Sequence, residues 1–137
     1  IGAPIRAAGL QFGWHNHDFE FLPLEDGTYP IEAILEAAPS LVLELDLAWV
    51  AVAGGSPVEW IERYKNRIIS AHIKDHAPKG ENLDEGGWAD VGHGVLDWDE
   101  ISACLRATGI GRFVLEHDNP KDGVRFATRS YEKLITF

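Results

Sequence analysis

Four short apolar runs recur along the chain, and each is followed at once by a residue able to bind a divalent metal ion. The runs are Leu10–Trp14, Leu41–Leu45, Ile68–Ala71 and Phe113–Leu115. Each has the length of a strand, and a segment with helical patterning follows each of the first three after a loop. Strands that alternate with helices at this pace predict βαβ units and a parallel sheet.

The expected helices have recognisable starting signals. Pro30 suits the first turn of one helix, and Ser56 followed by Pro57 suits the cap and first turn of another. Asp97, with Glu100 three residues later, resembles a capping box. The expected helical ranges are 31–38, 57–65, 97–108 and 124–135. The glycine-rich stretch 78–94 is expected to be a loop able to cover a site.

The number of units limits the fold. The chain has 137 residues with 45% hydrophobic content, which suits one globular unit with a real core. A closed eight-stranded (β/α)8 TIM barrel takes roughly 250 residues. The chain is therefore either half of such a barrel or a small open α/β sheet, and a potential ligand at every strand end favours the half barrel. We expect one partial domain over residues 1–137. Because a half barrel leaves two strand edges unpaired, we also expect a missing amino-terminal half or pairing between copies.

Composition narrows the class of partner. Twelve Lys and Arg against 22 Asp and Glu give a net charge of −10, which argues against nucleic acid. No apolar stretch reaches the roughly 18 residues of a membrane span, so no membrane partner is expected. A single cysteine, Cys104, permits a reducing compartment, and we expect a cytoplasmic protein. Because Ile1 is not an initiator methionine, any export signal is expected to lie outside this sequence.

The residues at the strand ends form a candidate metal site. Since the carboxyl ends of parallel strands share one rim, Asp46, His72 and Glu116 should converge there with either His15 or His17. Mixed imidazole and carboxylate ligands suit a divalent ion of borderline hardness. Residues two apart in a strand share a face, so one of the two histidines is free to bind substrate or to move protons.

Other polar and aromatic residues near the rim are candidates for substrate contacts. Lys74 is placed to hold a hydroxyl or enolate oxygen, and an ion pair with Asp75 is an equally expected alternative. Trp14 and Trp49 lie at or beyond strand ends, where aromatic faces commonly pack against sugar C–H surfaces. Packing in the core is the alternative for both tryptophans.

Taken together, several stretches of the chain resemble the sugar phosphate isomerase/epimerase family. They are Gly13–Phe21, Leu43–Asp46, His72–Asp75, Val91–Gly94 with Asp97 and Trp98, and Leu115–Asp118. That family has the xylose isomerase-like TIM-barrel fold, and the resemblance covers essentially the whole chain. It implies that the chain supplies the C-terminal half of the barrel, about the last four β/α units.

The resemblance also implies a ligand set. The family holds one divalent metal, often manganese and also zinc, magnesium or cobalt, with Glu, Asp, His and Glu from the last four strands. Asp46, His72 and Glu116 match the last three ligands, and His15 stands near the place of the first glutamate. We expect manganese or zinc first, and magnesium or cobalt as alternatives. The candidate substrate contacts are Trp14, His17, Glu20, Trp49, Lys74, Asp75 and His93.

The expected activity is that of a metal-dependent isomerase, epimerase or lyase acting on a sugar or keto-sugar. The metal would polarise a carbonyl while a base removes the neighbouring proton. Glu116 is the expected base, and His15 or His17 replaces the second carboxylate as the other acid–base group. A rival hypothesis is a non-catalytic truncated half barrel that keeps the metal site or only its ligands. A metal-dependent endonuclease is disfavoured by the net charge.

Overall fold

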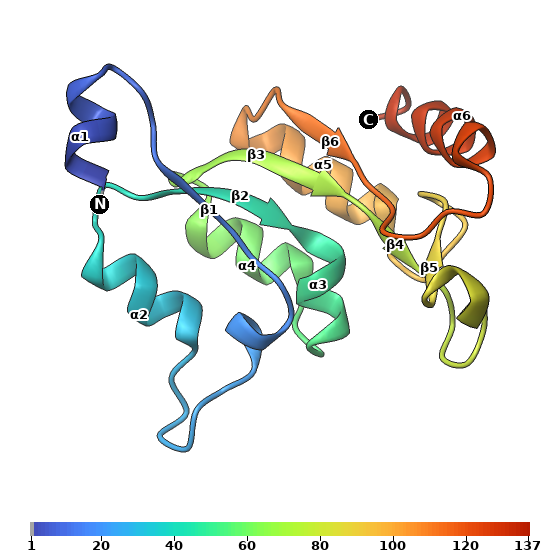
Figure 1. Ribbon diagram of the computed structural model, residues 1–137, viewed down its shortest axis with the longest axis horizontal. Helices are drawn as coiled ribbons and strands as arrows, with labels where there is room; N and C mark the ends of the chain where they lie inside the picture. Colours follow the sequence, from blue (N-terminus) through green and yellow to red (C-terminus); the bar gives the residue numbers. More distant parts are fainter. Residues whose placement is uncertain (1) are drawn as a thin grey trace.

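A four-stranded parallel sheet forms the centre of the fold. The computed structural model describes residues 2–137. The strands are β1 (Gly13–His15), β2 (Val42–Asp46), β3 (Ile68–Ile73) and β6 (Phe113–Leu115), and they lie in the order β1-β2-β3-β6. Each neighbouring pair is parallel, so all four carboxyl ends lie at one rim of the sheet (Figure 1). The predicted parallel sheet is confirmed.

Four helices occupy the expected positions, each boundary within one residue of its prediction. They are α2 (Pro30–Ala37), α4 (Pro57–Tyr64), α5 (Trp98–Thr108) and α6 (Gly123–Leu134). The Ser56 hydroxyl accepts a hydrogen bond from the backbone N–H of Glu59 at the start of α4. The Asp97 carboxylate accepts from the backbone N–H groups of Asp99 and Glu100 at the start of α5. The capping residues read from the sequence therefore start both helices as expected.

The remaining elements were not expected. The helix α1 (Gly2–Ala7) precedes β1, the short 3-10 helix η1 (Phe19–Phe21) follows it, and α3 (Leu47–Val52) begins directly after β2. The glycine-rich stretch, expected to be only a loop, contains a two-stranded antiparallel sheet of β4 (Asp75–His76) and β5 (Trp88–Ala89), with the 3-10 helix η2 (Leu83–Glu85) between them. The first strand is also shorter than the run that predicted it, since it begins at Gly13.

The two faces of the central sheet differ in character. Leu43, Leu45 and Ile73 are each about 1% exposed or less and belong to the main apolar core. The helices α4 and α5, which pack side by side, lie on one side of the sheet (Figure 1). Side chains alternate between faces along a strand, so the other face of β2 and β3 carries polar residues. These are Glu44, Asp46, Ser70 and His72.

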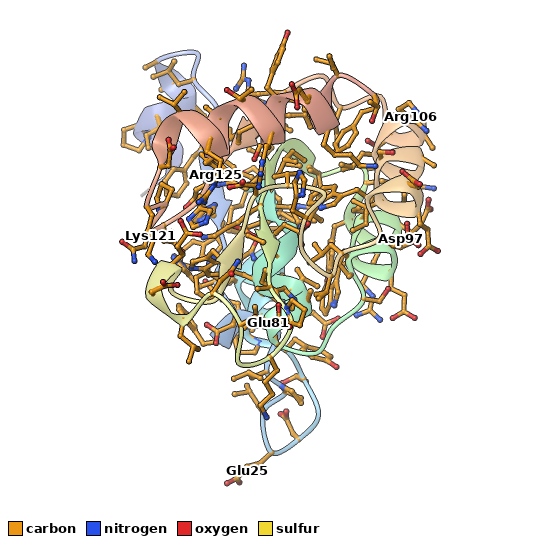
Figure 2. The ribbon with its side chains drawn as sticks, turned by 90° about the vertical axis from the view of Figure 1, so that its right-hand side faces the viewer. Glu25, Glu81, Asp97, Arg106, Lys121 and Arg125 are labelled. Carbon is orange, nitrogen blue, oxygen red and sulfur yellow. The ribbon has the colours of Figure 1, made fainter. Side chains whose placement is uncertain are left out.

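The periphery of the fold consists of the two edge strands and a projecting loop. β1 and β6 are the edge strands of the sheet. The loop that leads from η1 to α2 projects away from the body of the protein and carries Glu25 near its tip (Figure 2). In residues 2–137, no helix combines the length and the apolar character needed to cross a lipid bilayer.

Candidate metal centre at the rim of the sheet

Four side chains from four different strands converge at the carboxyl rim. His15 ends β1, Asp46 ends β2, His72 lies one residue before the end of β3, and Glu116 directly follows β6. Each offers one ligand atom, and these atoms all lie within 4.8 Å of one another. Ligand atoms about 2 Å from a common ion fall within that separation. The structure therefore brings together four residues that the sequence predicted as ligands.

Asp46 supplies a buried carboxylate in which only one of the two oxygens is hydrogen-bonded. Its Oδ1 accepts hydrogen bonds from the backbone N–H groups of Ala48 (2.9 Å) and Trp49 (3.1 Å) at the start of α3. Its Oδ2 is buried without a hydrogen-bond partner and lies 4.0 Å from Nδ1 of His72. Burial is the main reason that the pKa of Asp46 rises to about 6. One oxygen of this carboxylate is thus fixed by the backbone, and the other is free for a cation.

Asn16 holds the backbone of Asp46 in place. Its side-chain amide donates to the carbonyl oxygen of Asp46 (3.1 Å), and its side-chain oxygen accepts from the N–H of Asp46 (2.9 Å). Asn16 is fully buried, so these two bonds also pay its desolvation cost. Asn16 therefore ties the segment after β1 to the end of β2.

The two histidines of the group lie close together in a form suited to metal binding. The ring centroids of His15 and His72 are 4.3 Å apart. Burial, followed by the effect of neighbouring His72, lowers the pKa of His15 and favours its neutral form. Neutral imidazole is the form that binds metals. His17 is exposed and stands outside the group of four, with its ring 5.3 Å from that of His15 and 5.5 Å from that of Trp49.

Glu116 completes the group and links it to Lys74. Its carboxylate contacts Nδ1 of His72 and lies 3.4 Å from Nζ of Lys74. Burial acts to raise the pKa of Glu116, but the hydrogen bond with His72 and the charge of Lys74 outweigh it and lower that pKa overall. Glu116 is therefore ionised at neutral pH.

Lys74 is a fully buried cation whose ammonium group faces this rim. Its Nζ donates to Asp118 (2.7 Å) and lies 4.0 Å from the ring centroid of Trp88 and 4.8 Å from that of Trp49. Aromatic faces at these distances attract a cation. Lys74 thus pairs with Glu116 and Asp118, and the alternative of an ion pair with Asp75 is not what the structure shows.

Unpartnered atoms indicate that the group fits a cation. Within residues 2–137, three buried side-chain polar atoms lack a hydrogen-bond partner, and two of them are Nδ1 of His15 and Oδ2 of Asp46. Leaving such atoms unsatisfied costs about 1–3 kcal/mol each, so their concentration at one point calls for a reason. Two imidazoles and two carboxylates form a donor set that zinc and manganese accept. The residues present therefore fit one divalent ion.

Glu20 and Trp14, both predicted as substrate contacts, are hydrogen-bonded to each other in the structure. Glu20 is 1% exposed, and its two oxygens accept hydrogen bonds from Nε1 of Trp14 (2.9 Å) and from the backbone N–H of His17 (2.8 Å). Trp14 is partly buried and packs against the core. A buried carboxylate whose oxygens are already bonded has little capacity left for a sugar hydroxyl. The pair fixes the path of the chain through His15 and His17, and this geometry gives the two predicted substrate contacts no support.

Asp75, another predicted substrate contact, also lies inside the protein. Its carboxylate is fully buried and accepts five hydrogen bonds, four from backbone N–H groups and one from an indole. The donors are His76, Gly92, Gly94, Leu96 and Nε1 of Trp98. A Cβ at Gly94 would collide with this carboxylate, so only glycine fits there. Asp75 anchors the loop before α5 and is not available to a substrate.

His93 lies outside the group of four. It is exposed and lines a hollow of about 230 Å³ together with Arg125 and Arg129 of α6. Figure 2 shows Arg125 on that helix. Arg125 is paired with the buried carboxylates of Glu85 and Asp90. We therefore place His93 beside a surface network of ion pairs, and its predicted contact with substrate has no support from this geometry.

The sequence analysis assigned no role to two residues near the group of four, Asn16 and Glu44. Glu44 lies two residues before Asp46 on the same face of β2 and contacts His72. The hydroxyl of Ser70 donates to Glu44, and this bond is the main reason that the pKa of Glu44 is lowered. The period of two along β2 was a readable signal for Glu44, because an acidic side chain within an apolar strand needs a partner.

Solved structures share this fold. A sugar phosphate isomerase/epimerase from Parabacteroides distasonis ATCC 8503 matches with a TM-score of 0.75 and 28% identity, over 97% of this chain and 47% of that protein. A xylose isomerase domain protein from Planctomyces limnophilus matches with a TM-score of 0.70 and 21% identity, over 96% and 47%. The zinc-binding IolI protein matches with a TM-score of 0.67 and 18% identity, over 96% and 50%. No protein-family model matches the chain, and no curated protein matches it.

The comparisons confirm the resemblance and the fold predicted from the sequence. The chain has the α/β fold of the xylose isomerase-like TIM barrels and resembles sugar phosphate isomerase/epimerase proteins. It spans about half the length of the solved structures that it matches. Four parallel strands in an open sheet agree with half of an eight-stranded barrel.

Proposed function

We propose that the chain is the metal-binding part of an isomerase, epimerase or lyase that acts on a sugar or keto-sugar. The observation that carries this proposal is the convergence of His15, Asp46, His72 and Glu116 on one point, with two of their buried atoms lacking any partner. Zinc or manganese is the proposed ion, because the donor set is mixed and a structural relative binds zinc. The similarity at 28% identity to a sugar phosphate isomerase/epimerase supports a sugar as the substrate.

The proposed chemistry is removal of a proton from the carbon next to a sugar carbonyl. A bound divalent ion supplies Lewis-acid polarisation of the substrate's carbonyl and hydroxyl groups. Glu116 is the proposed base, since it is ionised, partly exposed and at the rim. With His15 among the ligands, exposed His17 is left as the second acid–base group.

Two residues are proposed to orient the substrate. The ammonium group of Lys74 is held beside Glu116 and is placed to donate to a substrate oxygen. Trp49 lies between His17 and Lys74, where its ring offers a face for sugar C–H groups. Both positions border the group of four ligands.

The test of this function is solvent deuterium exchange into candidate sugars and keto-sugars. The unaltered protein, loaded with zinc or manganese, should exchange the hydrogen next to the carbonyl of its substrate. Glu116→Gln should slow this exchange by about 10²-fold or more, because it removes the base. Asp99→Asn, which alters an exposed carboxylate on α5, is the matched control and should leave the rate unchanged.

Metal content measured on the same samples separates two roles of Glu116. A slow Glu116→Gln variant that keeps its ion supports Glu116 as the base, whereas loss of the ion shows that Glu116 is needed for ligation. Exchange at the unaltered rate in Glu116→Gln would refute the catalytic assignment.

A non-catalytic half barrel is the second candidate. Its supporting observation is that β1 and β6 are edge strands, in a chain that spans about half of the structures it matches.

If the chain is part of an enzyme, we propose that the active form pairs the edges of β1 and β6 with another half barrel, either a further segment or a second copy. An active species larger than one chain in light scattering supports the enzyme, and a metal-loaded monomer without exchange supports the second candidate. The single partial domain and the cytoplasmic location stay predictions.

A further inference from the structure

We infer that Glu44, held by Ser70, is a positioning residue that fixes the orientation and tautomer of His72 and so presents Nδ1 of His72 to the metal ion. This inference rests on the proposed metal site. It concerns residues that lie one step behind the ligands on the polar face of the sheet.

The contacts of His72 are divided between the two sides of its ring. Nε2 lies 3.1 Å from Oε1 of Glu44. Nδ1, on the other side, contacts Glu116 and lies 4.0 Å from Oδ2 of Asp46. One nitrogen of His72 therefore faces Glu44 alone, and the other faces the two carboxylates of the proposed site.

The chemistry of a carboxylate sets the tautomer. An ionised carboxylate accepts hydrogen bonds and donates none, so the His72 nitrogen that faces Glu44 has to carry the hydrogen. Nδ1 faces the carboxylates of Asp46 and Glu116, which are themselves proposed ligands, so with an ion among them Nδ1 would face the cation. The neutral imidazole would then keep its hydrogen on Nε2, toward Glu44, and its lone pair on Nδ1, toward the ion. A carboxylate behind a ligating histidine commonly fixes its tautomer and ring orientation in this way.

Ser70 holds Glu44 in position for this contact. The Ser70 hydroxyl is buried and donates to Oε2 of Glu44 at 2.7 Å, which leaves Oε1 for His72. Glu44 and Ser70 are direct partners in the register of β2 and β3, and His72 lies two residues beyond Ser70 on the same face. The hydrogen-bonded chain from Ser70 through Glu44 to His72 is therefore built by the pairing of two adjacent strands.

Glu44 lies outside the group of four proposed ligands and differs most clearly from Asp46, its neighbour on the same face of β2. It is not among the four residues whose ligand atoms converge, and its side chain is 39% exposed, whereas that of Asp46 is 0% exposed. Both oxygens of Glu44 already have partners, while Oδ2 of Asp46 has none. These differences favour a role that acts through His72 over direct ligation.

The test measures zinc affinity by competition with a chromophoric chelator. Glu44→Ala should weaken zinc binding by about 10- to 100-fold, the usual effect of removing a residue that orients a ligand. Glu44→Gln keeps an acceptor oxygen without the charge and should recover part of the loss. Ser70→Ala should cause a smaller loss, and Glu62→Ala, an exposed carboxylate on α4, should cause none.

Proton NMR of the zinc-loaded protein provides a second readout. An Nε2–H of His72 that donates to the side-chain oxygen at position 44 should give a slowly exchanging downfield signal in the unaltered protein and in Glu44→Gln, and that signal should be lost in Glu44→Ala. A purely structural effect on stability would not move this signal. If Glu44→Ala does not fold, the affinity and NMR signal of Glu44→Gln and Ser70→Ala decide the matter.

The possible failures are distinguishable. An unaltered protein that does not bind zinc overturns both the metal site and this inference. An unaltered protein that binds zinc, beside a Glu44→Ala variant of equal affinity with an intact His72 signal, overturns the inference alone. Complete loss of zinc in Glu44→Ala, as large as the loss in Asp46→Ala, would make Glu44 a ligand and would also overturn the positioning role.

Discussion

Asp75→Ala is expected to destabilise the protein by about 4 kcal/mol or more, a large part of the roughly 5–15 kcal/mol that stabilises a typical domain. The Asp75 carboxylate accepts five hydrogen bonds at full burial, so its removal leaves five donors facing a small void. A buried donor without a partner costs about 1–3 kcal/mol, and water entering the void would recover part of the sum. The measurement is urea unfolding followed by circular dichroism.

Asp99→Ala is the matched control for this experiment. Asp99 pairs with Lys133, but its side chain is 91% exposed, so its loss should leave the free energy of unfolding nearly unchanged. Asp75→Asn should also destabilise strongly, because its amide group would face N–H donors. An Asp75→Ala variant as stable as Asp99→Ala would contradict the role of Asp75 as the anchor of the loop before α5.

Asp46→Asn is expected to have the opposite effect and to stabilise the metal-free protein at pH 8. The pKa of Asp46 is about 6 in the folded protein, against an ordinary value of 3.8. The folded state therefore binds a proton more tightly than the unfolded state, and the stability due to that proton is full below pH 3.8 and lost by about pH 6. The difference in pKa corresponds to about 3 kcal/mol. Asparagine has no charge to bury, so the stability of the variant should not fall in this way as the pH rises.

The test is how the difference in the free energy of unfolding between Asp46→Asn and the unaltered protein changes with pH. In chelator-treated protein, the variant should gain up to about 3 kcal/mol over the unaltered protein at pH 8, and the gain should shrink towards zero near pH 4. Its side-chain oxygen can still accept from Ala48 and Trp49. Added zinc should stabilise the unaltered protein and leave the variant unchanged. A variant that is less stable than the unaltered protein at pH 8 would contradict this account.

The contrast between these two carboxylates distinguishes structure from function. Both are fully buried, yet Asp75 has five donors and Asp46 has two, with one oxygen left without a partner. A charge that is buried and only partly satisfied costs stability, and such costs persist mainly where function requires them. The unpartnered oxygen of Asp46 therefore favours Asp46, and not Asp75, as the carboxylate that binds the proposed ion.

The strands and most helices were predictable because their signals are local. Apolar runs predict β2 and β3, and Ser56 and Asp97 mark the starts of α4 and α5 by their own side-chain chemistry. The short helix α3 was hidden, since Leu47–Val52 is as apolar as the run that forms β2 and only Asp46 separates the two. Its start is set by Asp46, whose carboxylate caps it while also facing the site.

The convergence of the proposed ligands was predictable for a different reason from the surroundings of the other site residues. Parallel strands bring their ends to one rim, so the positions of Asp46, His72 and Glu116 follow from topology alone. The roles of Glu20 and Asp75 depend instead on which donors surround them, such as the indole of Trp98, which is 23 residues from Asp75 in the sequence. Contacts of that kind are set by tertiary packing, so residue type alone could not reveal the hydrogen bonds that hold both carboxylates.

Metal content is the most direct test of the central claim that the rim holds one divalent ion. It is measured by elemental mass spectrometry on purified protein soaked with zinc or manganese and then desalted, beside a His72→Ala/Asp46→Ala double variant treated in the same way. The account predicts about one equivalent of ion in the unaltered protein and none in the double variant. No retained ion in the unaltered protein, or equal retention in both proteins, would contradict it.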